Sequence, residues 1–184
     1  SKKVDDTTSF KQRFYFIDGK IEKNQFGGNY NFLTINLGKN DSISNEMAVI
    51  NSMGIIGITE HVSNNYSRVQ SILNRNSKIN ARLKNSSYFG SLMWNGVDYN
   101  ILQLLDIPRQ SNIKSGDTIV TGGMSTIFPE GIPIVKVIDT EEGASIKRIV
   151  NIQLFNDMSN LKNIYVIKDF DKYEIMNLEN NSNE

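Results

Sequence analysis

A serine and a histidine are the residues of this sequence best suited to catalyse a reaction. His61 is the only histidine, and Ser125 follows it with Asp98 or Asp106 between them. In a serine hydrolase the histidine takes the serine proton and an aspartate orients the histidine, so this chain order would suit one. Neither neighbour of Ser125 is glycine, although such a serine needs a tight glycine-rich turn to expose backbone N–H groups to an oxyanion. A serine hydrolase with His61 and Ser125 therefore stays as an alternative.

Metal and cofactor chemistry has little support in the sequence. The chain has no cysteine, which excludes disulfides, cysteine-bound zinc and a thiol nucleophile. Asp169, Asp171 and Glu174 lack the glycine and the regular spacing of a calcium loop. Gly122 and Gly123 lead into a proline-containing segment rather than into the helix that a phosphate loop requires. We expect no catalytic residue, no metal and no cofactor.

Aromatic side chains gather in one part of the chain and could stack on sugar rings. Trp94 lies close in sequence to Tyr88, Phe89 and Tyr99. Aromatic residues in strands usually pack into the core, where they bury a large apolar surface. A glycan-binding module that uses Trp94 is therefore a second alternative.

Composition sets limits on the class of protein. The 184 residues are 39% hydrophobic and 22% charged, and 20 basic residues balance 20 acidic ones. A formal net charge of zero gives no global field that would attract nucleic acid, so we expect no nucleic-acid partner. No apolar run approaches the ~18 residues of a membrane span. The chain opens with Ser1 rather than methionine, so any signal or membrane anchor is expected upstream.

Period-2 alternation dominates the chain and predicts strands. Leu33, Ile35 and Leu37 alternate with polar residues, and similar runs recur between short turn signals such as Asn95-Gly96. About a dozen short strands with close turns are typical of barrels or a sandwich. Residues 66–73 fit a strand or a helix, and we favour the strand because the pattern stops early.

Only one helical piece is expected, and the end of the chain is expected to have none. A turn at residues 157–163 would be capped by Asp157 or Ser159. Residues 169–184 are polar and rich in asparagine towards their end, so we expect a flexible tail.

Five segments, taken in order, resemble the MreC family of rod-shape-determining proteins. Residues 116–134 match most specifically: they read G-D-T-I-V-T-G-G-M-S-T-I-F-P-E-G-I-P-I and resemble the family pattern G-D-x-V-x-T-S-G-x-x-x-x-F-P-x-G-I-P-V. Weaker matches occur at residues 30–43, at 47–58, at 67–69 with 76–77, and at 161–167. Ser42 and Met47 replace usual glycines, and Gly122 stands where serine is common. The resemblance runs from about residue 14 to 168.

The resemblance implies a fold and a role. The fold would be all-β, with two small barrels of roughly six strands each, arranged as in chymotrypsin-like proteases but without a catalytic triad. The role would be a non-enzymatic scaffold of the cell-elongation machinery that organises peptidoglycan synthesis. Its partners would be a class-B penicillin-binding transpeptidase, MreD, indirectly MreB, and other copies of itself in dimers or filaments. The protein would be periplasmic and held at the inner membrane by an N-terminal helix and coiled coil absent from this sequence.

The domain limits and the contact site follow as expectations. Residues 1–12 would end the linker from the coiled coil, 13–75 would form the first barrel, with 163–168 as a candidate closing strand, and 76–158 would form the second. The candidate protein-contact loop lies between two strands of the second barrel and consists of Thr126, Ile127, Phe128, Pro129, Glu130 and Ile132. Phe128 would be either an exposed anchor for a partner or a plug in the core.

Overall fold

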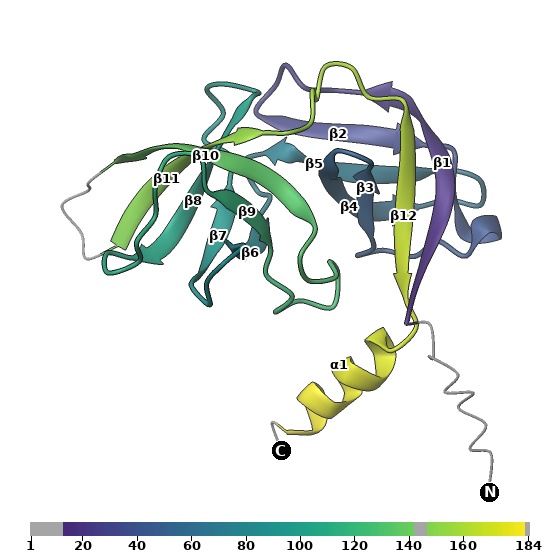
Figure 1. Cartoon of the computed structure of the whole chain (residues 1–184). Coiled ribbons are helices and arrows are strands. Elements are labelled where there is room, and N and C mark those ends of the chain that lie inside the picture. Colours follow the sequence, from purple (N-terminus) through teal and green to yellow (C-terminus); the bar gives the residue numbers. More distant parts are fainter. Residues whose placement is uncertain (1–12, 142–146, 183–184) are drawn as a thin grey trace, which may run out of the picture.

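Two closed β-barrels lie side by side in the computed structural model, which describes residues 13–141 and 147–182 (Figure 1). Each barrel has six strands, so the expected all-β fold with two small barrels is confirmed. The segment expected as a linker, residues 1–12, lies outside the described residues. A closed barrel has no unpaired edge strand. Loops and outward-facing side chains are therefore the main surfaces for partners.

The first barrel takes five strands from the N-terminal part of the chain and one from near its end. Its strands follow the order β1-β12-β3-β4-β5-β2 around the barrel. Their bounds are β1 Phe14–Asn24, β2 Tyr30–Ile35, β3 Ala48–Asn51, β4 Gly54–Val62, β5 Ser67–Asn74 and β12 Asn163–Asp169, with a short 3-10 helix at Lys39–Asp41. Because β12 pairs with both β1 and β3, the chain returns from the second barrel to close the first.

The second barrel is continuous in sequence. Its order is β10-β11-β8-β7-β6-β9. The bounds are β6 Ile79–Leu83, β7 Phe89–Met93, β8 Ile101–Pro108, β9 Thr118–Thr121, β10 Pro133–Glu141 and β11 Lys147–Leu154. The long connection between β9 and β10 carries the candidate contact loop.

Alternating side chains build the two cores. Leu33 and Ile35 of β2 are at most 1% exposed, whereas Thr34 between them is half-buried. Residues 67–73 of the stretch that fitted either period lie in strand β5, where Val69, Ser71 and Leu73 are buried, as is Ile72. Burying aliphatic side chains of this size stabilises the fold by about 1.5–3 kcal/mol each.

The barrels touch through backbone. A β-carbon added to Gly54 at the start of β4 would lie 2.5 Å from the carbonyl oxygen of Pro133 in β10. Beside this contact, the buried Asn156 side chain donates a hydrogen bond from Nδ2 to the Ile55 carbonyl oxygen at 3.2 Å. Such an approach allows no side chain between the strands, so glycine is required at position 54.

Of the two expectations on helices, one is confirmed in part and the other is wrong. Asp157 does cap a turn, its Oδ1 accepting from Ser159 N at 3.0 Å and from Ser159 Oγ at 2.6 Å, but residues 157–163 form no helix. These bonds hold the pKa of the exposed Asp157 below its usual value. The chain end, expected as a tail without regular structure, contains helix α1 at Lys172–Asn181. No helix within the described residues has the length and apolar character to cross a bilayer.

Candidate functional site

The structure gives His61 and Ser125 separate surroundings. The His61 side chain is 71% exposed on β4, with Nε2 3.9 Å from Glu60 Oε1. Ser125 Oγ accepts a hydrogen bond from Ile127 N at 3.0 Å and borders a different cavity from the one beside His61. A serine whose hydroxyl has no hydrogen bond to the imidazole is not activated by it. The arrangement therefore gives no support to the hydrolase alternative.

A fluorophosphonate probe tests this conclusion. We expect no labelling of the intact protein after prolonged incubation, because in the described part of the chain the Ser125 hydroxyl is bonded to the Ile127 N–H and not to the His61 imidazole. The measurement is intact-mass spectrometry, with an active serine hydrolase as a positive control. Labelling that disappears in both Ser125→Ala and His61→Ala would restore the hydrolase interpretation.

Trp94 is a core residue. Its side chain is only 5% exposed, and its indole N–H donates to the Asp98 carbonyl oxygen at 2.8 Å. Tyr99 packs edge-on against Phe26 of the first barrel, with ring centroids 5.8 Å apart. A buried indole offers no face to a sugar ring, so the position of Trp94 gives no support to the glycan-binding alternative.

Thr121 holds the candidate contact loop in one conformation. Its hydroxyl donates to the Pro129 carbonyl oxygen at 2.6 Å and accepts from Ile132 N at 2.8 Å. Its carbonyl oxygen accepts from Gly131 N at 3.0 Å. Arg82 of β6 adds an ion pair to Glu130, at 2.7 Å between Nη2 and Oε1. A loop fixed in this way loses little conformational entropy when it meets a partner.

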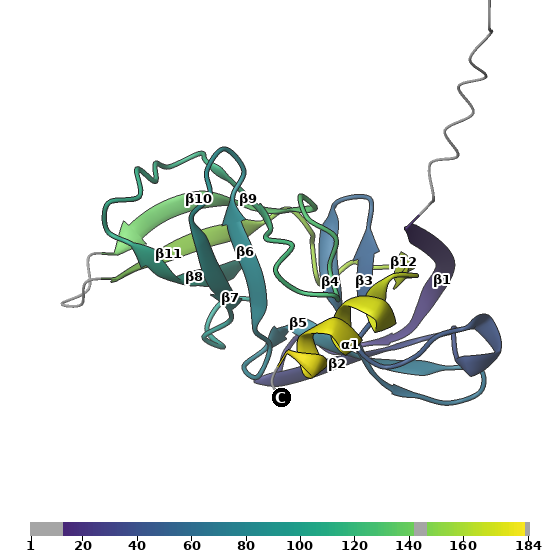
Figure 2. The same ribbon diagram turned by 90° about the horizontal axis from the view of Figure 1, so that it is seen from below.

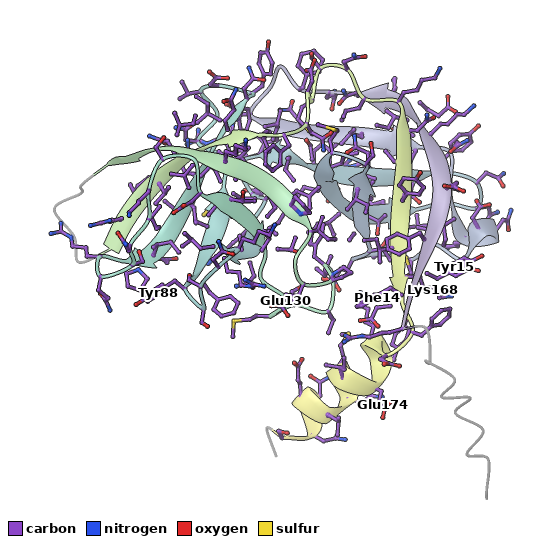
Figure 3. The ribbon with its side chains drawn as sticks, viewed as in Figure 1. Phe14, Tyr15, Tyr88, Glu130, Lys168 and Glu174 are labelled. Carbon is purple, nitrogen blue, oxygen red and sulfur yellow. The ribbon has the colours of Figure 1, made fainter. Side chains whose placement is uncertain are left out.

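Phe128 was expected to be either an exposed anchor for a partner or a plug in the core, and the structure distinguishes these two roles. Its side chain is 5% exposed and belongs to the core cluster, so it is the plug and not the anchor. The large apolar side chain that the β9–β10 connection does expose is Met124, at 71%. Glu130 is exposed at the underside of the second barrel (Figure 3).

The loop also reaches the first barrel. A cavity of 320 Å³ separates Ile127 and Phe128 from Ile58 of β4. A second cavity has a volume of 220 Å³. Thr126 and Ile127 of the loop line it together with Ile167 of β12. The candidate contact loop therefore lies at the junction of the two barrels rather than at a free tip.

A larger groove lies beside this junction, between α1 and the hairpin of β4 and β5. Its volume is 860 Å³. We call it the α1 groove, and its lining residues are Thr34, Lys39, Ile43, Ser44, Asn45, Glu46, His61, Val62, Ser63, Tyr66, Ser67, Arg68, Lys172, Tyr173 and Met176. Five of these also line the 220 Å³ cavity, so groove and cavity are neighbours that share Ile43 and Glu46 in their walls.

The groove combines apolar surface with charged and polar side chains. Lys39, Arg68 and Lys172 line it together with one carboxylate, that of Glu46. Arg68 Nε lies 3.0 Å from Glu60 Oε2, and its guanidinium stacks 3.7 Å above the ring of Phe32. Within the described residues no cluster of three or more histidine, cysteine or acidic side chains could hold a metal.

Lys172 ties α1 to the rim of the groove. Its Nζ donates to the Glu46 carbonyl oxygen at 2.7 Å. Partial burial lowers the pKa of Lys172, because desolvation disfavours the ammonium, while the charges of Glu46 and Asp169 partly offset this effect.

Nothing in the sequence pattern pointed to this groove, since its lining comes from segments far apart in the chain.

Comparison with known proteins places the fold in a family. Residues 21–168 match the model of the family described as "Rod shape-determining protein MreC, barrel core". The chain is 28% identical over 146 residues to the cell shape-determining protein MreC of Geobacillus stearothermophilus, an alignment that covers 73% of this chain and 50% of the relative. The chain thus spans about half the length of the curated relatives that it matches.

Solved structures share the fold. MreC of Listeria monocytogenes superposes with a TM-score of 0.77 at 21% identity, covering 85% of this chain and 76% of the other. A structure described as a complex between penicillin-binding protein PBP2 and MreC from Helicobacter pylori gives a TM-score of 0.66 at 14% identity, covering 86% and 99%. The family model covers every strand of both barrels except most of β1 and the last residue of β12. The chain therefore belongs to the MreC family.

Proposed function

We propose that this chain is the extracytoplasmic scaffold domain of a cell-elongation machinery and binds a class-B penicillin-binding transpeptidase. The observation that carries the proposal is the match of the whole double barrel to the MreC family. The relative described as a complex with PBP2 supports a partner of that class. MreD, MreB acting indirectly, and further copies of the chain complete the proposed partners. In this proposal the full-length protein is held at the inner membrane from its N-terminal side and catalyses no reaction.

The geometry suits a scaffold. Two rigid barrels present fixed surfaces, and the loop at their junction is held by Thr121 and by the Arg82–Glu130 ion pair. Rigid surfaces lose little entropy on binding, so modest contact areas can give useful affinity. The proposed contact surface is the loop of residues 126–132 together with the adjoining Met124, the large exposed apolar side chain of this connection.

Biolayer interferometry with the periplasmic part of a class-B transpeptidase from the same cell tests the proposal. We expect saturable binding at micromolar concentration or tighter. Met124→Asp should weaken it about tenfold or more, because the substitution places a charge at the proposed interface and costs at least about 1.4 kcal/mol there. Met124 is exposed, so the substitution should leave the fold intact.

The matched control is Val97→Asp. Val97 is 84% exposed on the turn between β7 and β8, so the two variants place the same charge at different surfaces of one barrel. Equal loss in both would move the contact away from the loop. No binding by the unchanged chain at about 50 µM, with binding still absent when the chain is dimerised to gain avidity, would contradict the transpeptidase assignment.

A further inference from the structure

A polar surface cavity lies at the end of the second barrel opposite the candidate contact loop. Its volume is 560 Å³, within the range of about 300–1,000 Å³ that is usual for small-molecule sites. The turn between β6 and β7 forms one wall, and the connection from β8 to β9 forms the other. Figure 2 shows that α1 crosses the first barrel and leaves β6, β7 and β9 uncovered.

Arg82 fixes the wall that the turn between β6 and β7 provides. Its Nη1 donates to the Lys84 carbonyl oxygen at 3.0 Å, and its Nη2 pairs with Glu130 of the candidate contact loop. Within the turn, Ser86 Oγ accepts from Tyr88 N at 3.1 Å. The wall that carries Lys84 and Tyr88 is therefore formed before any ligand arrives.

Hydrogen bonds also fix the opposite wall. Asp117 Oδ2 accepts from Lys114 N at 2.9 Å, and Asp117 N donates to the Lys114 carbonyl oxygen at 3.1 Å. Strand β10 supports this turn, because Val137 exchanges hydrogen bonds of 2.9 Å with Gly116 N and with the Asp117 carbonyl oxygen. A cavity between two fixed walls loses little entropy when it takes up a ligand.

The cavity presents two lysines whose ammonium groups have no partner in the described part of the chain. Lys84 and Lys114 line it with exposed side chains, and within residues 13–141 and 147–182 neither ammonium forms an ion pair or a hydrogen bond. Asp117 is the one carboxylate in the lining, and its Oδ2 already accepts from a backbone N–H. An anionic ligand would therefore meet two cations that give up no existing bond.

The rest of the lining is typical of a site for a sugar. Asn85 and Asn112 provide amides that can donate to and accept from hydroxyl groups. The half-buried Tyr88 packs against the core and also lines the cavity, so its ring can cover the apolar C–H face of a pyranose. Leu83 is the one aliphatic side chain in the lining and is 7% exposed, so an apolar ligand would gain little here. Figure 3 shows Tyr88 at the lower edge of the second barrel, away from α1.

We propose that this cavity binds an acidic saccharide, a sugar that carries a carboxylate or a phosphate. Lys84 and Lys114 bind the anionic group, the amides of Asn85 and Asn112 bind hydroxyl groups, and Tyr88 packs against the ring. The site goes beyond the proposed scaffold role, which needs no small ligand, and it does not depend on the transpeptidase contact.

Heteronuclear NMR titration with three sugars that share one ring tests the proposal. The neutral probe is N-acetylglucosamine, and the acidic probes are N-acetylmuramic acid, which adds a carboxylate to that ring, and N-acetylglucosamine phosphorylated on its primary hydroxyl. We expect saturable shifts in the amides of residues 83–88 and 112–118 at millimolar concentration, as befits a single ring on a surface. At least one acidic sugar should bind about fivefold or more tightly than the neutral one, because two exposed charge pairs together supply that factor.

A double variant isolates the two lysines. Lys84→Gln combined with Lys114→Gln should lower the affinity for the acidic sugars to that for the neutral sugar and leave the neutral sugar unaffected. The control combines Lys23→Gln with Lys162→Gln, which removes the same net charge from exposed positions outside the cavity lining. The control should keep the preference for the acidic sugars.

A second variant tests the aromatic ring. Tyr88→Leu keeps an apolar side chain against the core and removes the ring, so the fold should persist while all three sugars bind about threefold or more weakly. Tyr30→Leu is the control, because Tyr30 is 56% exposed and is not in the lining. The melting temperatures of both variants verify that the fold is kept.

The outcomes decide the proposal and the source of the ligand. Tighter binding of the carboxylated or of the phosphorylated sugar, lost in the lysine variant alone, supports the site and separates glycans with carboxylated sugars from glycans that carry phosphate. Inorganic phosphate that binds as tightly as the acidic sugars would show an adventitious ion only and would overturn the saccharide. No shifts at residues 83–88 and 112–118 with any sugar, or equal binding of neutral and acidic sugars, would overturn the proposal and leave the scaffold function untouched.

Discussion

Phe128→Ala is expected to lower the free energy of unfolding by about 3 kcal/mol, the lower end of the 3–5 kcal/mol typical for a buried phenylalanine. The side chain is 5% exposed and part of the core cluster, so its removal opens a cavity in the second barrel. The lower end applies because Phe128 already borders the 320 Å³ cavity and therefore lacks atomic contacts on one side.

Guanidinium denaturation followed by tryptophan fluorescence is the direct measurement, because Trp94 is the only tryptophan and lies in the core of the same barrel. Val97→Ala is the control: at 84% exposure it should change stability by less than about 0.5 kcal/mol. If Phe128→Ala kept full stability but lost transpeptidase binding, Phe128 would be the partner anchor after all and its burial in the free chain would be transient.

Much of the fold was predictable because a barrel wall imposes a period of two on every strand. Leu33 and Ile35 face the core and Thr34 does not, so the sequence itself records which face is buried. The ambiguous stretch follows this rule only from residue 67 to 71, because Ser71, Ile72 and Leu73 of β5 are all buried. Closure could not be predicted in this way, because the pairing of β12 with β1 joins residues about 150 positions apart.

The α1 groove and α1 itself left no comparable record in the sequence. A helix that buries no residue needs no regular apolar stripe, and residues 172–181 show none strong enough to reveal it. The Phe128 side chain was ambiguous for a related reason: an apolar residue in a loop can point either way, and the hydroxyl of Thr121, several residues earlier, fixes its direction through the loop backbone. Sites assembled from distant segments require the three-dimensional structure.

Gly54→Ala is expected to reduce stability by about 2–5 kcal/mol and to loosen the junction between the barrels. Gly54 has a φ of +147°, where a residue with a β-carbon is strained by about 1–2 kcal/mol. The new methyl group would also lie 2.5 Å from the Pro133 carbonyl oxygen, and overpacking of this kind costs about 1–3 kcal/mol. The Pro133 backbone has little freedom to retreat, because β10 pairs with both β9 and β11.

Two further glycines separate the strain of the backbone from the contact between barrels. Gly116 has a φ of +90° with open space around it, so Gly116→Ala should cost only the backbone strain. Gly27 has open space around it and no such φ, so Gly27→Ala should leave stability nearly unchanged. The measurement is guanidinium denaturation by Trp94 fluorescence and by circular dichroism, which report the second barrel and both barrels respectively. In Gly54→Ala the two transitions should separate, because weaker coupling lets one barrel unfold before the other. If Gly54→Ala and Gly116→Ala lost equal stability with coincident transitions, the close approach at Pro133 would contribute nothing to holding the barrels together.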